Sequence, residues 1–142
     1  MKTLLVALLS LILASSIFAA QRGIKKIDVQ TSSGRSLHLY SQSHALVIGV
    51  SDYTAGWQDL DSVEEDIQSV GDALQIHGFN VVKVINPTER ELRNKIEDFI
   101  GEYSYEPYNR QLINFSGHGY TQKKGTRKFG YLVPYVSPNP SE

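Results

Sequence analysis

The chain has 142 residues and a formal net charge of −1, and none of its residues is cysteine. The near-neutral charge argues against nucleic acid as the principal partner, because neutralising phosphates requires a concentrated basic surface. The absence of cysteine excludes disulfides, thiolate metal ligands and a cysteine nucleophile within these residues. His38, His44 and His77 lack partners at metal-ligand spacing, so we expect no metal site and assign no cofactor. The length predicts a single domain.

Residues 1–20 have the anatomy of a secretory signal peptide. Lys2 precedes a largely apolar run over residues 4–14, and the small residues Ala19 and Ala20 follow. The run is shorter than the roughly 20 apolar residues that cross a bilayer. We therefore expect export to the periplasm or the medium, with no stable membrane span. An uncleaved membrane anchor is the alternative.

Residues 21–43 are polar and irregular, and they precede a domain that we assign to residues 44–142. Val29 and Leu39 belong to two short alternating patterns separated by Ser33-Gly34. Such a pattern is typical of a β-hairpin. A flexible leader is the alternative.

Three apolar runs and two amphipathic stripes alternate along the domain. Residues 45–50 form a continuous, β-branched run, which predicts a strand buried on both faces. Residues 81–85 and 111–115 predict two further strands. The stripes have helical spacing: they are Leu60, Val63, Ile67, Val70 and Leu74, and then Leu92, Ile96, Phe99, Ile100 and Tyr103.

Local signals mark the ends of both helices. Residues 62–65 (Ser-Val-Glu-Glu) can form a capping box at the first helix, with Asp59 or Asp61 as the alternative cap. Gly78 is a natural helix stop. Residues 88–91 (Thr-Glu-Arg-Glu) predict a capping box at the second helix. Beyond the third strand, residues 120–128 read as a loop or short hairpin, and residues 131–133 as a short extended piece.

The order strand–helix–strand–helix–strand predicts an α/β fold with a mainly parallel sheet and right-handed crossovers. In such sheets the functional groups gather beyond the carboxyl ends of the strands. Three segments should meet at that edge, namely 51–61, 86–87 and 116–120.

His118 is the main candidate for chemistry at this edge. Gly117 and Gly119 flank it, and they remove side-chain bulk so that a substrate backbone can approach and amides can face an oxyanion. A histidine in such a loop can serve as general acid or base. Ser116 lies two residues before it, but no nucleophile turn of the G-x-S-x-G type supports a serine hydrolase. Asp66 could bind a cationic substrate side chain, or it could simply complement the helix dipole.

Five segments, in order, resemble the caspase-like domains of the bacterial and metacaspase type. They are His44–Tyr53, Leu60–Asp66, Gly78–Val81, Asn114–Tyr120 and Tyr131–Pro134. The resemblance implies a caspase-like three-layer sandwich and a cysteine endopeptidase with a cysteine–histidine dyad. It assigns His118 as the catalytic base, the Gly119 amide to the oxyanion hole, and Asp66 and Ser116 to a pocket for a basic residue. It therefore implies peptide or protein substrates cleaved after Arg or Lys, with calcium activation left open.

The sequence departs from this family in one respect. Family members carry the nucleophile after a fourth strand, roughly 50 residues beyond the histidine, whereas this sequence ends at Glu142 without a cysteine. We expect an N-terminal portion of a longer peptidase, with a sheet that is incomplete at its C-terminal end. A naturally short, catalytically inactive caspase-fold module for binding or scaffolding is the alternative. A flavodoxin-like binding domain would share the layer order, but no phosphate-binding loop is present.

Overall fold

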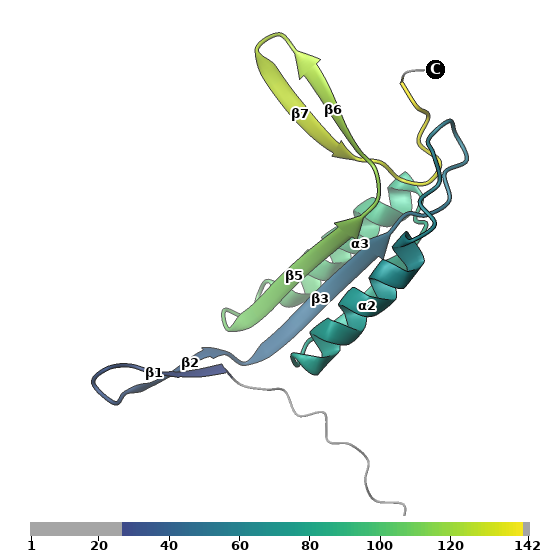
Figure 1. Cartoon of the computed structure of the whole chain (residues 1–142). Coiled ribbons are helices and arrows are strands. Elements are labelled where there is room, and N and C mark those ends of the chain that lie inside the picture. The colour runs from purple at the N-terminus through teal and green to yellow at the C-terminus, as the bar shows by residue number, and fades with distance from the viewer. Residues whose placement is uncertain (1–26, 141–142) are drawn as a thin grey trace, which may run out of the picture.

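The computed structural model describes residues 27–140, so the predicted signal peptide lies outside the described residues. Its centre is a parallel three-stranded sheet in the order β4–β3–β5. Figure 1 shows β3 and β5 side by side. The strands are β3 (Gln42–Gly49), β4 (Asn80–Ile85) and β5 (Asn109–Ser116). The predicted α/β class with a mainly parallel sheet is confirmed, and the sheet is incomplete.

Strand β3 supplies the core on both faces of the sheet. Ala45 and Val47 pack against helix α2 (Val63–Ile76), whereas Leu46 and Ile48 pack against helix α3 (Glu89–Tyr103). Successive side chains of a strand point to opposite faces, so one apolar run serves two helices. Figure 1 shows α2 and α3 on the two sides of the sheet, which makes the three layers.

The capping box predicted for α2 is wrong, whereas the one predicted for α3 is confirmed. Ser62 occupies the N-cap position of α2, but its backbone is already helical and its side chain makes no capping bond. A capping hydroxyl reaches the first amides from an extended backbone, which Thr88 adopts at α3. There the Thr88 hydroxyl accepts from the Glu91 amide, and the Glu91 carboxylate accepts from the Thr88 amide at 2.9 Å.

Gly78 ends α2 as predicted. Its φ of 82° is a left-handed conformation that favours glycine. The Gly78 amide donates to Gln75 and the Phe79 amide donates to Leu74, both at 3.0 Å. These two bonds satisfy carbonyls that the helix leaves unpaired, in the Schellman arrangement. The chain then turns directly into β4.

Two antiparallel hairpins flank the sheet. Strands β1 (Ile27–Gln30) and β2 (Ser36–Tyr40) pair as one hairpin, which lies within the segment 21–43. Strands β6 (Gly119–Lys124) and β7 (Arg127–Leu132) form a second hairpin, which projects from the end of β5 in Figure 1. Within residues 27–140, no helix is long and apolar enough to span a bilayer.

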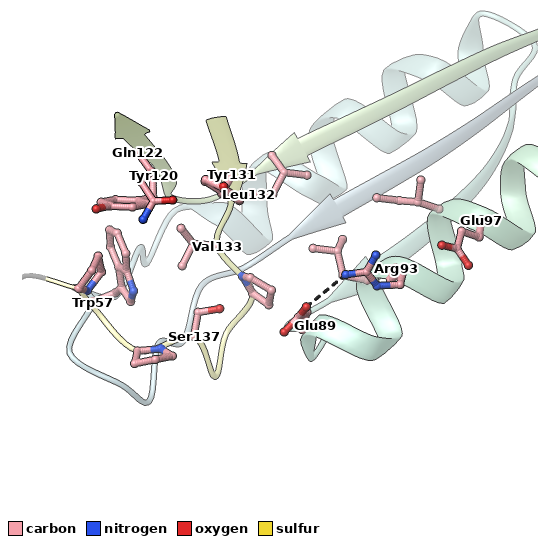
Figure 2. A pocket seen from close by; sticks show the side chains of 15 residues that line it. Trp57, Glu89, Arg93, Glu97, Tyr120, Gln122, Tyr131, Leu132, Val133 and Ser137 are labelled. Atoms are coloured by element: carbon pink, nitrogen blue, oxygen red, sulfur yellow. Dashed lines mark hydrogen bonds and ion pairs between the residues drawn. The ribbon is translucent and has the colours of Figure 1, made fainter. Parts of the chain in front are cut away.

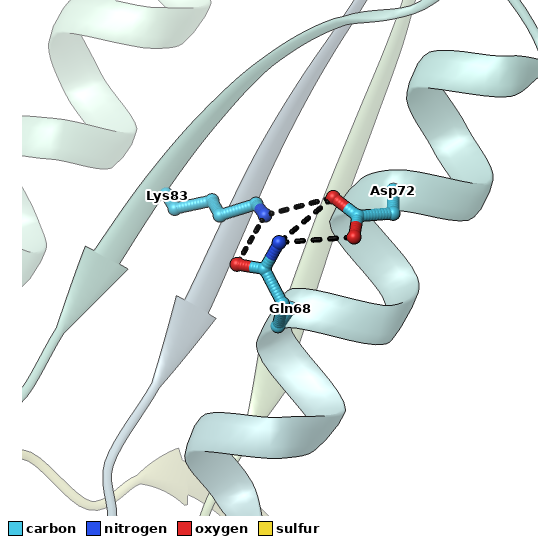
Figure 3. A network of polar contacts seen from close by, with 3 residues as sticks. All are labelled: Gln68, Asp72 and Lys83. Atoms are coloured by element: carbon cyan, nitrogen blue, oxygen red, sulfur yellow. Dashed lines mark hydrogen bonds and ion pairs between the residues drawn. The ribbon is translucent and has the colours of Figure 1, made fainter.

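A polar network joins α2 to the outer strand β4 (Figure 3). The Lys83 ammonium donates to Gln68 at 2.9 Å and lies 3.4 Å from the Asp72 carboxylate. Gly71 leaves room for the Lys83 side chain, because a Cβ at position 71 would overlap Cε of Lys83. The network therefore holds the lysine across α2 instead of letting it extend into solvent.

Gly49 is required where α2 crosses the end of β3. A Cβ at this position would lie 2.6 Å from Cγ1 of Ile67 and 2.8 Å from Cγ1 of Val63. Gly49→Ala should lower the free energy of unfolding by about 1–3 kcal/mol, because both neighbours belong to the packed core. Urea denaturation measures the change. Gly101→Ala is the control, since nothing lies within 4 Å of its Cβ, and it should be neutral or stabilising. Equal effects of the two substitutions would contradict the packing argument.

The stability of the fold should depend on pH through His44. The residue is 5% exposed, and its ring stacks on the Tyr103 ring with 3.7 Å between centroids. Burial lowers the pKa of His44 below 6.5, and Glu102 offsets part of that effect. Protonation therefore favours the unfolded chain, so stability is retained above pH 6.5 and falls as the pH drops towards the lowered pKa.

His44→Phe keeps an aromatic ring in the stack and removes this titration. Urea denaturation at pH 7.5 and pH 5 should show a smaller loss of stability for the variant than for the parent chain. Identical losses in the two proteins would show that His44 does not titrate as described.

Candidate functional site

The three predicted segments do meet at the carboxyl edge of the sheet. Asn86, just beyond β4, holds the loop that follows β3. Its Oδ1 accepts from the amides of Ser51 at 2.8 Å and Asp52 at 3.3 Å. Asn86 has a φ of 48°, a left-handed conformation that asparagine tolerates better than most residues. The loop over residues 51–62 is thereby fixed to the end of the neighbouring strand.

His118 lies in the turn between β5 and β6, with its ring between two aromatic side chains. The ring centroid is 4.8 Å from that of Tyr53 and 5.2 Å from that of Trp57. The residue is only partly buried, so it remains at the sheet edge and does not enter the core. Tyr53 and Trp57 both come from the loop after β3, which therefore builds the walls of the histidine site.

A main-chain carbonyl orients the His118 imidazole. Nε2 lies 2.8 Å from the carbonyl oxygen of Gln58. A carbonyl can only accept, so Nε2 must carry the hydrogen. In the neutral ring Nδ1 then has the free lone pair, and it is the nitrogen able to accept a proton from a substrate or nucleophile.

The Tyr53 hydroxyl is inserted between His118 and Val133. The Val133 amide donates to the His118 carbonyl at 3.1 Å, as in a hydrogen-bonded pair of an antiparallel ladder. The reciprocal bond is replaced by two others: the His118 amide donates to the Tyr53 hydroxyl at 2.7 Å, and the hydroxyl lies 3.4 Å from the Val133 carbonyl. Burial raises the pKa of Tyr53, an effect that the His118 amide partly offsets. The phenol therefore remains protonated at neutral pH.

The two glycines around His118 have different environments. A Cβ on Gly117 would lie 2.8 Å from the Tyr53 hydroxyl and about 3 Å from the Phe115 ring, whereas one on Gly119 would meet nothing closer than 3.8 Å. The expectation that both glycines make room for substrate is therefore corrected at Gly117, where the protein itself occupies the space. The Gly119 amide should face away from β7, because bonded and non-bonded pairs alternate along the ladder.

Ser116 and Asp66 lie on different elements of the same edge. Ser116 ends β5, and its carbonyl accepts from the Val50 amide at 2.9 Å. Asp66 lies exposed in the first turn of α2, and within residues 27–140 its carboxylate forms no hydrogen bond or ion pair. No contact joins Asp66 to Ser116 or His118, so their roles in substrate binding stay predictions.

A cavity of about 710 Å³ opens beside the histidine site (Figure 2). Its walls come from α3, the β6–β7 hairpin and residues 133–140. Trp57 and Tyr120 lie at one end, and Glu97 lies at the other. The volume is within the range of ligand-binding pockets. Trp57 thus borders both His118 and a space that can hold part of a peptide. Among residues 27–140, no group of three potential metal ligands is present.

One comparison identifies the family. The model of the caspase domain matches residues 42–138, which is more than half of the chain. The chain belongs to the caspase-domain family. A search of curated proteins finds no match. Membership supports a cysteine peptidase by descent and implies protein substrates, yet this caspase domain contains no cysteine.

Sequence reasoning placed His118 at the edge but missed the residues that hold it. Tyr53, Trp57 and Gln58 lie in the segment 51–61, which is predicted to reach this edge, but no motif singles out any of the three. Aromatic residues following a strand buried on both faces are the one signal that could have drawn attention to two of them. Gln58 carries no signal, because its contribution is a main-chain oxygen.

The neutral His118 ring should be the Nε2–H tautomer. Nitrogen-15 NMR of the chain at a pH where the ring is neutral should report a protonated Nε2 and an unprotonated Nδ1, because the Gln58 carbonyl accepts from Nε2. The exposed ring of His77 provides an internal comparison. A predominant Nδ1–H tautomer at His118 would contradict the assigned bond.

Proposed function

We propose that this caspase domain is part of a cysteine endopeptidase that cleaves after Arg or Lys. The observation that carries the proposal is the orientation of His118, whose Nε2 is held by the Gln58 carbonyl so that Nδ1 is available. The nucleophilic thiol must come from outside these 142 residues, since none of them is cysteine. Calcium dependence is open, and we assign no cofactor.

His118 would act twice in the reaction. Nδ1 accepts the thiol proton, and the thiolate attacks the carbonyl carbon of the scissile bond. The Gly119 amide stabilises the oxyanion of the tetrahedral intermediate. The imidazolium then gives its proton to the leaving amine as the carbon–nitrogen bond breaks. Water hydrolyses the resulting thioester, with the imidazole again as base.

The proposed preference for basic residues rests on Asp66 and Ser116. A carboxylate and a hydroxyl suit a guanidinium or ammonium group, whereas the Asp66 carboxylate would repel the carboxylate of an Asp side chain. Asp66 is exposed at the edge where β3 ends. Its carboxylate lacks an ion-pair partner within the described range, so it can pair with a substrate cation.

The absence of cysteine favours a second candidate, which is a catalytically inactive caspase-fold module for binding or scaffolding. Without a thiolate no acyl-enzyme forms, and a histidine with an oxyanion hole leaves only residual catalysis. The two candidates differ in whether the gene encodes a cysteine segment beyond Glu142. A cysteine-bearing strand there supports the peptidase, and an end of the reading frame supports the inactive module.

We also propose that the protein acts after export. This rests on residues 1–20, whose composition is that of a signal peptide. Amino-terminal sequencing of the mature protein from culture fractions tests both the export and the cleavage near Ala19 or Ala20.

The peptidase proposal predicts a defined pattern of activity. The 142-residue chain should not hydrolyse peptides. The protein that includes the cysteine segment should cleave peptides ending in Arg or Lys and not those ending in Asp. His118→Ala should lower kcat by about 10²–10⁴-fold, which is the scale of general acid–base catalysis. Full activity of the His118→Ala protein would refute the mechanism.

The specificity has its own test. Asp66→Lys should abolish the preference for basic residues through charge repulsion, while kcat on any residual substrate changes less. Asp72→Lys is a matched control, because Asp72 lies on the same helix but is engaged with Gln68 and Lys83. An unchanged preference in the Asp66→Lys protein would refute the assignment.

A further inference from the structure

We propose that Tyr53 is a positioning residue for His118, with its hydroxyl acting as a spacer that sets how far the histidine turn stands from β7. The proposal rests on the proposed function for its catalytic meaning, but its structural part is independent of it. The family resemblance assigns no role to this side chain.

The hydroxyl occupies a position where an ordinary ladder would have none. His118 and Val133 are opposite residues, one step beyond the Gly119–Leu132 pair of the β6–β7 ladder. Two such residues exchange two direct bonds in a regular hairpin. Here one bond is direct, and the other passes through the Tyr53 oxygen. The Tyr53 hydroxyl oxygen therefore separates the His118 amide from the Val133 carbonyl and holds the turn open on that side.

The surroundings fix that oxygen in place. Tyr53 is 7% exposed and belongs to a cluster with Val50 and Val133. Its own amide donates to the Asp59 carboxylate at 2.7 Å, and the next amide, that of Thr54, donates to the Tyr135 carbonyl. The tyrosine backbone is thus tied both to its own loop and to the segment after β7, so its hydroxyl is a fixed reference for the turn.

The same loop supplies the acceptor for the imidazole. Tyr53 holds the His118 amide, and the Gln58 carbonyl, five residues later, holds Nε2. The loop after β3 therefore holds both the main chain and the ring of His118. A displacement of the turn moves Nε2 relative to Gln58, so the spacer controls the direction of Nδ1. Gly117 fits this arrangement, since any Cβ there would meet the hydroxyl.

Removal of the hydroxyl should let the turn close. In Tyr53→Phe the ring packing against His118 is retained, but the His118 amide loses its acceptor. The cheapest replacement is a direct bond to the Val133 carbonyl, because an unpaired buried amide is costly. That movement draws the His118 turn towards β7 and lengthens the distance from Nε2 to the Gln58 carbonyl.

NMR of the 142-residue chain tests the structural part. In the parent chain an NOE should connect the Tyr53 ring or hydroxyl proton with the His118 amide. In Tyr53→Phe the neutral His118 ring should lose its single tautomer and show a mixture of Nε2–H and Nδ1–H. Tyr105→Phe is the control, because Tyr105 is 87% exposed, and it should leave the His118 signals unchanged. An absent NOE in the parent chain, or unaltered His118 nitrogen shifts in folded Tyr53→Phe, would overturn the proposal.

The catalytic part is tested in the protein that includes the cysteine. Tyr53→Phe should lower kcat by about tenfold to a hundredfold, the scale expected for a misplaced catalytic group, with KM changed less than about twofold. A rise in KM of that same size with an unchanged kcat would instead place Tyr53 in substrate binding and refute its positioning role. Should His118→Ala retain activity, the proposed function fails, while the NMR result on Tyr53 stands or falls separately.

Discussion

The burial of β3 on both faces is the constraint on which the rest of the structure depends. Residues 45–48 are at most 1% exposed, and burying a Leu or Ile side chain contributes about 1.5–3 kcal/mol. Strand β3 packs against α2 on one face and against α3 on the other. The chain therefore crosses over both faces of the sheet, and β4 and β5 pair in parallel with the two edges of β3. Everything after the carboxyl ends of these strands then converges at one edge.

The elements of the sheet were predictable because each follows from local or periodic signals. The apolar run over residues 45–50 and the stripe through Leu92 and Phe99 have one interpretation each, and Thr88 with Glu91 forms its capping box from neighbouring residues alone. The start of α2 was less predictable. There Ser62 already has a helical backbone, and the carboxylate of Asp59, an alternative cap, is bonded to the Tyr53 amide. A tertiary hydrogen bond therefore occupies the Asp59 carboxylate, which the local sequence offers as a cap.

The candidate site was only half predictable for a related reason. His118 stands out between two glycines, and its position at a strand end follows from the topology. Its neighbours do not follow, since Tyr53 and Trp57 reach it across 60 or more residues of sequence. Gly117 also shows how one residue type supports two interpretations. A glycine beside a catalytic residue suggests room for substrate, yet here its missing side chain makes room for a phenol hydroxyl.

The bond between Nε2 of His118 and the Gln58 carbonyl has a consequence for genetics. The acceptor belongs to the main chain, and the Gln58 side chain is exposed. Replacing that side chain leaves the oxygen where it is, so saturation mutagenesis would score position 58 as tolerant. The bond that fixes the tautomer of His118 therefore depends on the path of the backbone and not on the identity of residue 58.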